Sequence, residues 1–242
     1  MIVVPEGPTL LLVTQPDHAH FSGELLSLWR AGGLPEHPRR DDLLFAAREH
    51  DNGWREADAA PRWNAASGRP HDFVTLPRQE RIEIWERGTC RFATERPYAG
   101  LLITRHALNL FGGRRGEEGW DSFLDFLDDF ESSLIEETGA GREEVEADYP
   151  LIDLADLISL TACTRRQEPV ERHGVRIVPA PGADATVGLA PFPLAGATTF
   201  RVPCRRVPSR EYRGDADFGG ELAAARWEEM TVRLTEAVSP EP

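Results

Sequence analysis

The sequence predicts a mainly α-helical protein in which a helical core carries a small accessory antiparallel β-sheet. Apolar side chains recur at helical spacing between residues 15 and 166, whereas β-branched segments bounded by glycine and proline lie before and after that region. The chain has 242 residues, of which 40% are apolar, and this is enough to bury one core. We therefore expect a single domain over residues 1–242, with a core of about five to six helices at 15–166 and accessory β elements at 1–14 and 167–242.

A β-hairpin is expected at the start of the chain. A turn rich in proline and glycine at residues 5–8 separates two apolar segments, at 2–4 and 9–14. Glycine and proline become frequent again after residue 166, where we expect strands that join the hairpin in one small sheet. The segments that predict these strands are 175–178, 199–202 and 230–234, and residues 222–226 favour a helical turn.

The region between the two β regions contains six segments with helical periodicity. Most of them begin near an acidic residue or a proline and end near glycine or proline, which favour helix starts and stops. Asp17 is the expected N-cap of the first helix, and Pro150 is a place where the last helix can bend. Residues 55–75 are expected to form a loop. The predicted helices cover about residues 17–30, 41–53, 77–88, 98–111, 120–138 and 142–163.

The charge of the chain excludes several classes of function. With 41 acidic and 27 basic side chains, its net charge of −14 disfavours binding to nucleic acid, because a phosphate backbone would be repelled. Every basic residue is arginine, so chemistry that requires lysine, such as a Schiff base or a phosphate-loop lysine, is excluded. No apolar run approaches the roughly 20 residues of a membrane helix, and no signal peptide is recognisable. We expect a cytoplasmic protein that binds a small-molecule substrate and does not bind a membrane. The sequence leaves open whether the protein forms a homo-oligomer.

Ionisable side chains occupy the apolar faces of several predicted helices. His18 shares the inward face of the first helix with Phe21 and Leu25, and His50 and Asp51 end the second helix. His106 and Asp156 lie among apolar neighbours in two later helices. Burying an unpaired carboxylate costs several kcal/mol, so each inward carboxylate needs a cation or several donors. One metal ion could compensate the carboxylates and bind the imidazoles together.

The donor set predicts a divalent metal, namely Mn, Fe, Mg or Zn, because imidazole and carboxylate together form mixed nitrogen and oxygen sites. The expected ligands are His18, His50, Asp51 and Asp156. A second ion can bind if His106 joins them.

The same residues resemble the HD superfamily of helical, metal-dependent phosphohydrolases and phosphodiesterases. The pattern H…HD…D of that superfamily is carried here by His18, the doublet His50-Asp51 and Asp156, over roughly residues 15–165. A closer resemblance is to an uncharacterised bacterial family, DUF3891, and covers most of the chain. It is carried by the segments TQPDH at 14–18, AREHDNGW at 47–54 and GRPHDF at 68–73.

The sequence departs from the superfamily at one informative position. Phosphohydrolases of this superfamily often contain the motif HD-x-G-K, in which the lysine helps to bind phosphate. Here Trp54 occupies the position of the lysine, and the nearest cationic residue is Arg55. We expect Arg55, Trp54 and Arg105 to bind substrate. The second doublet, at residues 71–72, follows a proline in a stretch that is rich in turn residues, and it is interpreted as part of a loop.

The resemblance implies a metal-dependent phosphohydrolase that acts on a small phosphate ester or nucleotide, with a metal-activated water as the nucleophile. Asp51 and His106 are the expected catalytic residues, and His106 is either a second-metal ligand, a general acid or a substrate contact. Two alternatives stay open at this point. One is a di-iron oxygenase of the HD type, and the other is a non-catalytic module that binds a metal or ligand.

Overall fold

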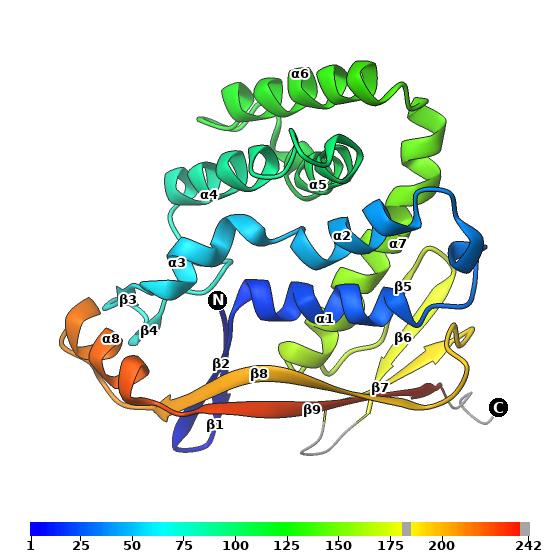
Figure 1. Cartoon of the computed structure of the whole chain (residues 1–242). Helices are drawn as coiled ribbons and strands as arrows, with labels where there is room; N and C mark the ends of the chain where they lie inside the picture. The colour runs from blue at the N-terminus through cyan, green and yellow to red at the C-terminus, as the bar shows by residue number, and fades with distance from the viewer. Residues whose placement is uncertain (181–184, 238–242) are drawn as a thin grey trace.

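The computed structural model, which describes residues 1–180 and 185–237, is a mixed α/β fold. Helices are stacked over one face of a long, curved seven-stranded sheet (Figure 1). The expectation of a mainly helical, all-α protein with a small accessory sheet is therefore wrong. Residues 181–184 and 238–242, which belong to the region predicted to supply accessory β elements, lie outside the described part.

The sheet joins the two ends of the chain. Its strand order is β1-β2-β8-β9-β7-β6-β5, and every neighbouring pair is antiparallel except β7 and β9. The N-terminal hairpin thus forms one edge and pairs with β8 near the C-terminus. The strands of this sheet are β1 (Ile2–Glu6), β2 (Thr9–Val13), β5 (Val170–Arg172), β6 (Val175–Pro179), β7 (Ala185–Ala190), β8 (Thr198–Pro208) and β9 (Trp227–Glu236).

The sequence understated the sheet because its longest strands are amphipathic. In β8 and β9 the buried residues alternate with exposed ones, many of them charged. Only the most apolar segments, 199–202 and 230–234, predicted strands, and β5 and β7 were not predicted at all. The predicted N-terminal hairpin is confirmed.

The predicted helices are confirmed within a few residues at their ends, but α1 begins earlier than expected. Its N-cap is Thr14, whose side chain accepts a hydrogen bond from the backbone NH of Asp17. The expected turn near residue 222 is the end of a longer helix, α8. The helices are α1 (Gln15–Ser27), α2 (Arg40–Glu49), α3 (Arg55–Ala59), α4 (Arg78–Cys90), α5 (Pro97–Phe111), α6 (Asp121–Thr138), α7 (Arg142–Cys163) and α8 (Asp215–Ala224), with 3-10 turns η1 (Leu34–Glu36), η2 (Asn52–Trp54) and η3 (Gly112–Arg114).

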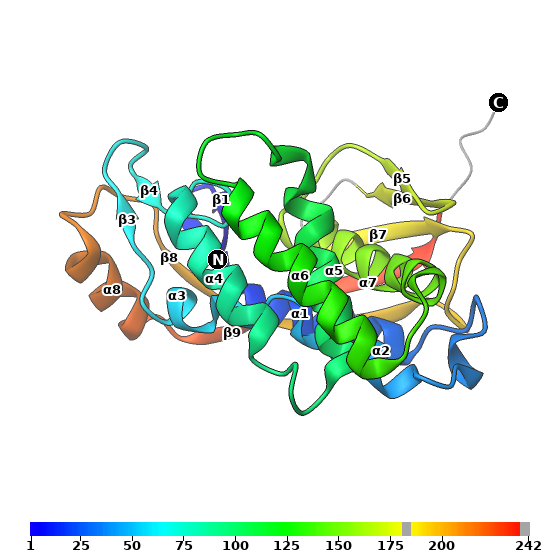
Figure 2. The same ribbon diagram turned by 90° about the horizontal axis from the view of Figure 1, so that it is seen from above.

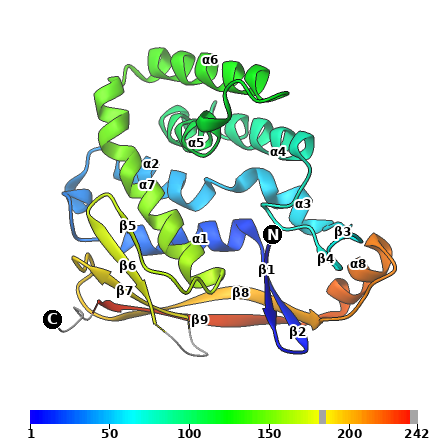
Figure 3. The same cartoon turned by 180° about the vertical axis from the view of Figure 1, so that it is seen from behind.

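One hydrophobic core runs from the sheet into the helices. Helix α1 lies directly on the sheet. The ring centroid of its Phe21 is 5.0 Å from that of Phe200, which lies on β8. Helix α7 descends from the level of α6 to the sheet, and α6 is the outermost helix, above α5 (Figures 2 and 3). Helices α1, α2, α5 and α7 therefore meet in the interior, above the sheet.

The segment 55–75, expected to be a loop, contains the short helix α3 and a two-stranded hairpin of β3 (Trp63–Asn64) and β4 (Arg69–Pro70). Trp63 packs against Tyr212 and Phe218, so this segment closes one end of the molecule together with α8. None of the helices in the described ranges has the length and apolarity needed to cross a bilayer.

Candidate metal centre

A buried cluster of imidazoles and carboxylates lies where four helices meet. His18 comes from α1, His106 from α5 and Asp156 from α7, while His50 and Asp51 follow the last turn of α2. Each of these residues is buried, and Asp156, the most exposed of them, retains only 7% of its accessible surface. The structure thus brings together the residues expected to bind metal, although they are far apart in sequence.

The imidazole of His18 is held by a serine on the facing helix. Ser159 Oγ donates to the carbonyl of His18 at 3.0 Å, so it accepts a hydrogen bond from His18 Nδ1 at 2.6 Å. Nδ1 is thereby occupied, and Nε2 faces Asp51 Oδ2 at 2.7 Å. An imidazole nitrogen and a carboxylate oxygen at that distance share either a proton or a metal ion.

His50 is oriented by its own helix. Its Nδ1 donates to the carbonyl of Ala47 at 2.8 Å, which leaves Nε2 facing the carboxylates of the cluster. That nitrogen is buried without a hydrogen-bond partner in the described residues, 3.2 Å from Asp156 Oδ1 and 3.7 Å from Asp51 Oδ2. Buried polar atoms are normally paired, and an ion in the cluster would satisfy this one.

The turn after His50 is fixed by contact with α4. Asn52 Nδ2 donates to the carbonyls of Glu49 and Gly88, which ties the turn to that helix. Gly53 lies so close to α4 that an added Cβ would be 2.1 Å from the carbonyl oxygen of Ile84. Glycine at this position lets the turn approach α4 while it presents Asp51 to the cluster.

A chain of hydrogen bonds orients His106. Tyr149 OH donates to Asp153 Oδ1 at 3.4 Å, and the same oxygen therefore accepts from His106 Nδ1 at 3.0 Å. His173, in the turn between β5 and β6, in turn contacts Asp153 at 2.7 Å. The outcome is the same as for the other two imidazoles: Nδ1 is occupied, and Nε2 faces a carboxylate, here Asp156 Oδ2 at 3.8 Å.

The carboxylates dominate the electrostatics of the cluster. Burial lowers the pKa of His50, but Asp51 and Asp156 outweigh that effect and raise it to about 9. Burial raises the pKa of Asp156, yet the facing imidazole of His50 holds it well below its usual range. The pKa of His106 is lowered, mainly by burial, despite the opposing charge of Asp156. The cluster therefore attracts positive charge.

Two overlapping groups have the spacing of metal ligands. In each, the candidate ligand atoms lie within 4.8 Å of one another. Both groups contain His50, so the cluster has donors for one ion or for two adjacent ions. One group consists of His18, His50 and Asp51, and the other of His50, His106 and Asp156.

A pocket of about 210 Å³ opens onto the cluster. Asp51, Asp156 and His106 line it, whereas His18 and His50 lie deeper. Some of the buried polar atoms that have no hydrogen-bond partner in residues 1–180 and 185–237 belong to residues that line it. They are Gln15 Oε1, Trp54 Nε1 and Arg81 Nε, each on a residue that lines the pocket.

Of the expected substrate-binding residues, Trp54 lines this pocket and the two arginines do not. Arg55 contacts Glu49 at 2.6 Å and lies over the ring of Phe92. Arg105 lies 3.5 Å from Glu131. The second His-Asp doublet, at 71–72, is not part of either candidate ligand group, and His71 bonds to the carbonyl of Thr75 in its own turn.

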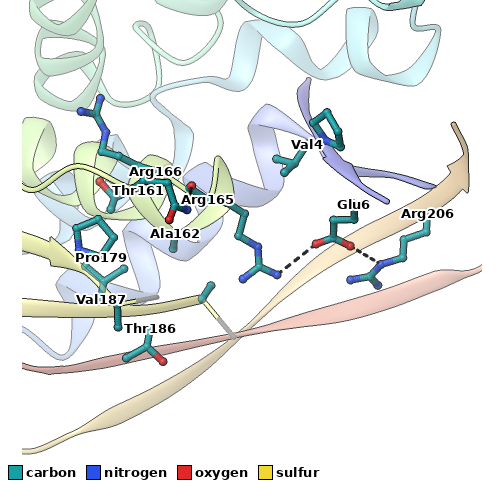
Figure 4. A pocket seen from close by; sticks show the side chains of 14 residues that line it. Val4, Glu6, Thr161, Ala162, Arg165, Arg166, Pro179, Thr186, Val187 and Arg206 are labelled. Atoms are coloured by element: carbon teal, nitrogen blue, oxygen red, sulfur yellow. Dashed lines mark hydrogen bonds and ion pairs between the residues drawn. The ribbon is translucent and has the colours of Figure 1, made fainter. Parts of the chain in front are cut away.

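A separate concavity of about 450 Å³ lies at the end of α7 (Figure 4). Arg165 and Arg166, which follow the helix of Asp156, line this concavity rather than the pocket at the cluster. Glu6 lies 3.5 Å from Arg165 and 2.9 Å from Arg206, so these two arginines of the concavity already have an acidic partner. None of the five cluster residues is among the described residues that line this concavity.

Sequence reasoning missed the residues that orient the imidazoles and the cations of the pocket. Ser159 and Tyr149 share α7 with Asp156, at spacings of three and seven residues, which place them on the same helix face. That periodicity could have identified both. Arg81 and Arg114 also line the pocket, but their flanking sequence is that of ordinary surface arginines, and nothing local distinguishes them.

Comparison with known proteins identifies one family. A family model described as "Protein of unknown function (DUF3891)" matches residues 1–209. This match includes the cluster and most of the sheet but ends before β9. No curated protein matches the chain, and no solved structure does.

Proposed function

The chain belongs to the DUF3891 family, and we propose from its site that it is a metal-dependent hydrolase of small phosphate esters or nucleotides, with a ligand set of the HD type. The residues of the pattern H…HD…D, which are His18, His50, Asp51 and Asp156, converge on one point in the interior. The resemblance to the HD superfamily supports the reaction class, and the geometry supports the metal.

The orientation of the three imidazoles is the observation that carries the proposal. Each Nδ1 is engaged by an outer partner, and each Nε2 faces Asp51 or Asp156. A histidine that binds a metal faces the ion with one ring nitrogen and is oriented by an outer hydrogen bond at the other, and all three imidazoles have this orientation toward the two carboxylates. A proton on each Nε2 would satisfy its contact with Asp51 or Asp156 one at a time. A single divalent ion can satisfy several of these contacts together.

A divalent ion in this cluster would lower the pKa of water and polarise a phosphoryl oxygen. Asp51 and Asp156 border both the cluster and the pocket, so they can hold the ion and accept a hydrogen bond from the attacking water. Because burial lowers the pKa of His106, its Nε2 carries a lone pair near neutral pH. That state suits a ligand or a proton acceptor better than the general acid considered from the sequence.

Metal analysis and a substrate panel test this proposal. We expect the purified protein to bind one or two equivalents of Mn, Fe, Zn or Mg and to hydrolyse a member of a panel of phosphomonoesters, phosphodiesters and nucleotides. His50→Gln and Asp156→Asn should lose metal and activity. His71→Gln is the matched control, because it changes the other His-Asp doublet, outside the cluster. Full metal content in a folded His50→Gln protein would contradict the proposal.

One observation favours a second candidate, the di-iron oxygenase. His50 belongs to both candidate ligand groups, so the two ions would be adjacent. Two irons per chain with an absorbing oxidised state, and no phosphatase activity with any metal, would favour this candidate. Bound metal without turnover in either assay would favour a non-catalytic metal-binding module.

A further inference from the structure

Two arginines place positive charge in the pocket beside the cluster. Arg81 comes from α4 and Arg114 from η3, and both line the pocket. Arg81 has no acidic partner within the described parts of the chain, and its buried Nε has no acceptor there. Arg114 contacts Glu117, an exposed residue three positions away, at 2.9 Å. A guanidinium that is partly removed from water without a carboxylate is unusual in a chain with this excess of acid.

The two guanidinium groups lie near the same aromatic side chain. They lie 5.5 and 5.1 Å from the centre of the same ring, that of Trp120. Burial and, to a smaller extent, the like charge of Arg114 lower the pKa of Arg81. An anion bound between them would offset both the repulsion and the lost hydration.

An aromatic wall connects these arginines to the cluster. The ring of His106 lies 5.7 Å from Trp85, which lies 5.7 Å from Phe111. Phe111 in turn stacks on Trp120 at 5.1 Å, and Trp120 is the ring near which both arginines lie. The carboxylates of the cluster and the cations therefore occupy different ends of this series of contacts.

Apart from Gln15, the remaining lining residues are apolar or aromatic, and the space is small. Trp54 and Phe73 line it, and Val74 and Leu110, which are 62% and 46% exposed, bring apolar side chains to its rim. The volume of about 210 Å³ is below the roughly 300–1,000 Å³ of pockets for drug-sized ligands. The pocket therefore fits a flat body about the size of one aromatic ring.

We propose that this pocket binds a small organic anion in which a flat apolar body separates an oxyanion, held by Arg81 and Arg114, from the group that reacts at the cluster. The oxyanion is a carboxylate or a phosphate that is not itself cleaved. The identity of this ligand as the substrate rests on the proposed hydrolase function, whereas the anion site is independent of it.

Calorimetric binding of simple aromatic probes tests the anion site directly. The probes are benzoate and phenylphosphonate, which separate the carboxylate and phosphate sources of the oxyanion, and benzamide, the neutral analogue of benzoate. We expect at least one of the two anions to bind about tenfold or more tightly than benzamide. Arg81→Gln and Arg114→Gln should each remove most of that preference.

Two controls distinguish this site from the metal and from the general surface charge. Arg115→Gln should leave binding within about twofold, because Arg115 is the exposed neighbour of Arg114 and contacts Asp125 and Asp128. His50→Gln should also retain binding of the anionic probe, because the proposed anion site does not include the metal. A probe that binds through the metal would instead be lost in this variant. Binding that survives Arg81→Gln and Arg114→Gln, or that is equal for benzoate, phenylphosphonate and benzamide, overturns the inference.

A kinetic comparison tests the link to the reaction. With the metal-loaded protein, 4-carboxyphenyl phosphate should have a lower KM than phenyl phosphate, and Arg81→Gln should abolish that difference. Equal KM values in the unchanged protein contradict the assignment of this anion to the substrate. If neither ester is hydrolysed but anion binding still depends on Arg81, the hydrolase proposal fails and the anion site stands.

Discussion

The three histidines of the cluster differ in the group that holds Nδ1. A serine hydroxyl orients His18, a main-chain carbonyl orients His50, and a tyrosine hydroxyl orients His106. Outer hydrogen bonds of this kind set the tautomer and direct the other nitrogen, and losing one typically weakens metal binding by about 10–100-fold. They can therefore be tested without changing any ligand.

Tyr149→Phe removes the acceptor for His106 Nδ1 and leaves every ligand in place. We expect it to weaken metal binding in the group of His50, His106 and Asp156 by about 10–100-fold, measured by Mn²⁺ titration. Tyr98→Phe is the matched control, because Tyr98 donates to buried Asp148 at 2.6 Å, and Asp148 contacts His37, away from the cluster. Both variants should lose about 1–3 kcal/mol of stability, but only Tyr149→Phe should lose metal. Equal metal affinity in the two variants would show that the hydroxyl of Tyr149 has only a structural role.

The raised pKa of His50 predicts how the metal-free protein responds to pH. Because its pKa is about 9 in the folded state and 6.5 ordinarily, protonated His50 stabilises the fold fully below pH 6.5. That contribution is lost as pH rises from 6.5 through about 9. Urea unfolding in EDTA should show this decline, and His50→Gln should lack it. Added metal should remove the decline, since the ion replaces the proton. A decline of the same size in His50→Gln would assign it to other groups.

At the scale of elements, the close contact between η2 and α4 positions the His-Asp doublet. Gly53 and Gly88 face each other across it, and either Cβ would meet main-chain atoms that cannot rotate away. A glycine after the doublet thus has a packing reason that needs no phosphate. It explains why Gly53 is present although the following lysine of the HD-x-G-K pattern is not.

Gly53→Ala should separate the turn from α4 and move Asp51. We expect a loss of about 1–3 kcal/mol in the free energy of unfolding, with weaker metal binding. Gly112→Ala is the control, because Gly112 has helical torsion angles and no atom within 4 Å of an added Cβ. It should be neutral or slightly stabilising. Urea titration and Mn²⁺ binding of both proteins make the comparison, and an unchanged Gly53→Ala protein would refute this role for the contact.

At the scale of the molecule, the sheet supports the helices that carry the cluster. Strand β9 lies between β7 and β8, and β8 contacts α1, which bears His18. Damage to the middle of the sheet should therefore reach the site, although no strand contributes a member of the five-residue cluster. The match to the family model ends before β9, but the sheet needs this strand to be continuous.

Val232→Asp tests this dependence, because Val232 is fully buried in β9. An unpaired carboxylate there should cost several kcal/mol and abolish metal binding together with the cooperative unfolding transition. If that protein does not fold, Val232→Ala should still lose about 2 kcal/mol. Thr231→Asp adds the same charge at the exposed neighbouring position, opposite Arg201, and should be tolerated. Equal stability of Val232→Asp and Thr231→Asp would contradict the role of the sheet.

The helices were predictable because their signal is local. Apolar periodicity, proline starts and glycine stops located six of them within a few residues, and the same periodicity placed His18, His50, His106 and Asp156 on inward faces. The sheet was underestimated because β8 and β9 bury only alternate residues and pair with distant segments. Arg55 and Arg105 were chosen for their sequence neighbours, but each lies beside an acidic residue outside the pocket.

The sequence by itself determined that this chain buries imidazoles and carboxylates on several helices, because the face on which a residue lies depends only on its own helix. The tertiary structure decided that these groups meet, that each imidazole presents Nε2, and that Arg81 and Arg114 share their pocket. Those properties depend on contacts such as Ser159 with His18 or Tyr149 with His106, between residues far apart in the chain. Such contacts form only when α1, α5 and α7 pack together, and no local pattern encodes that packing.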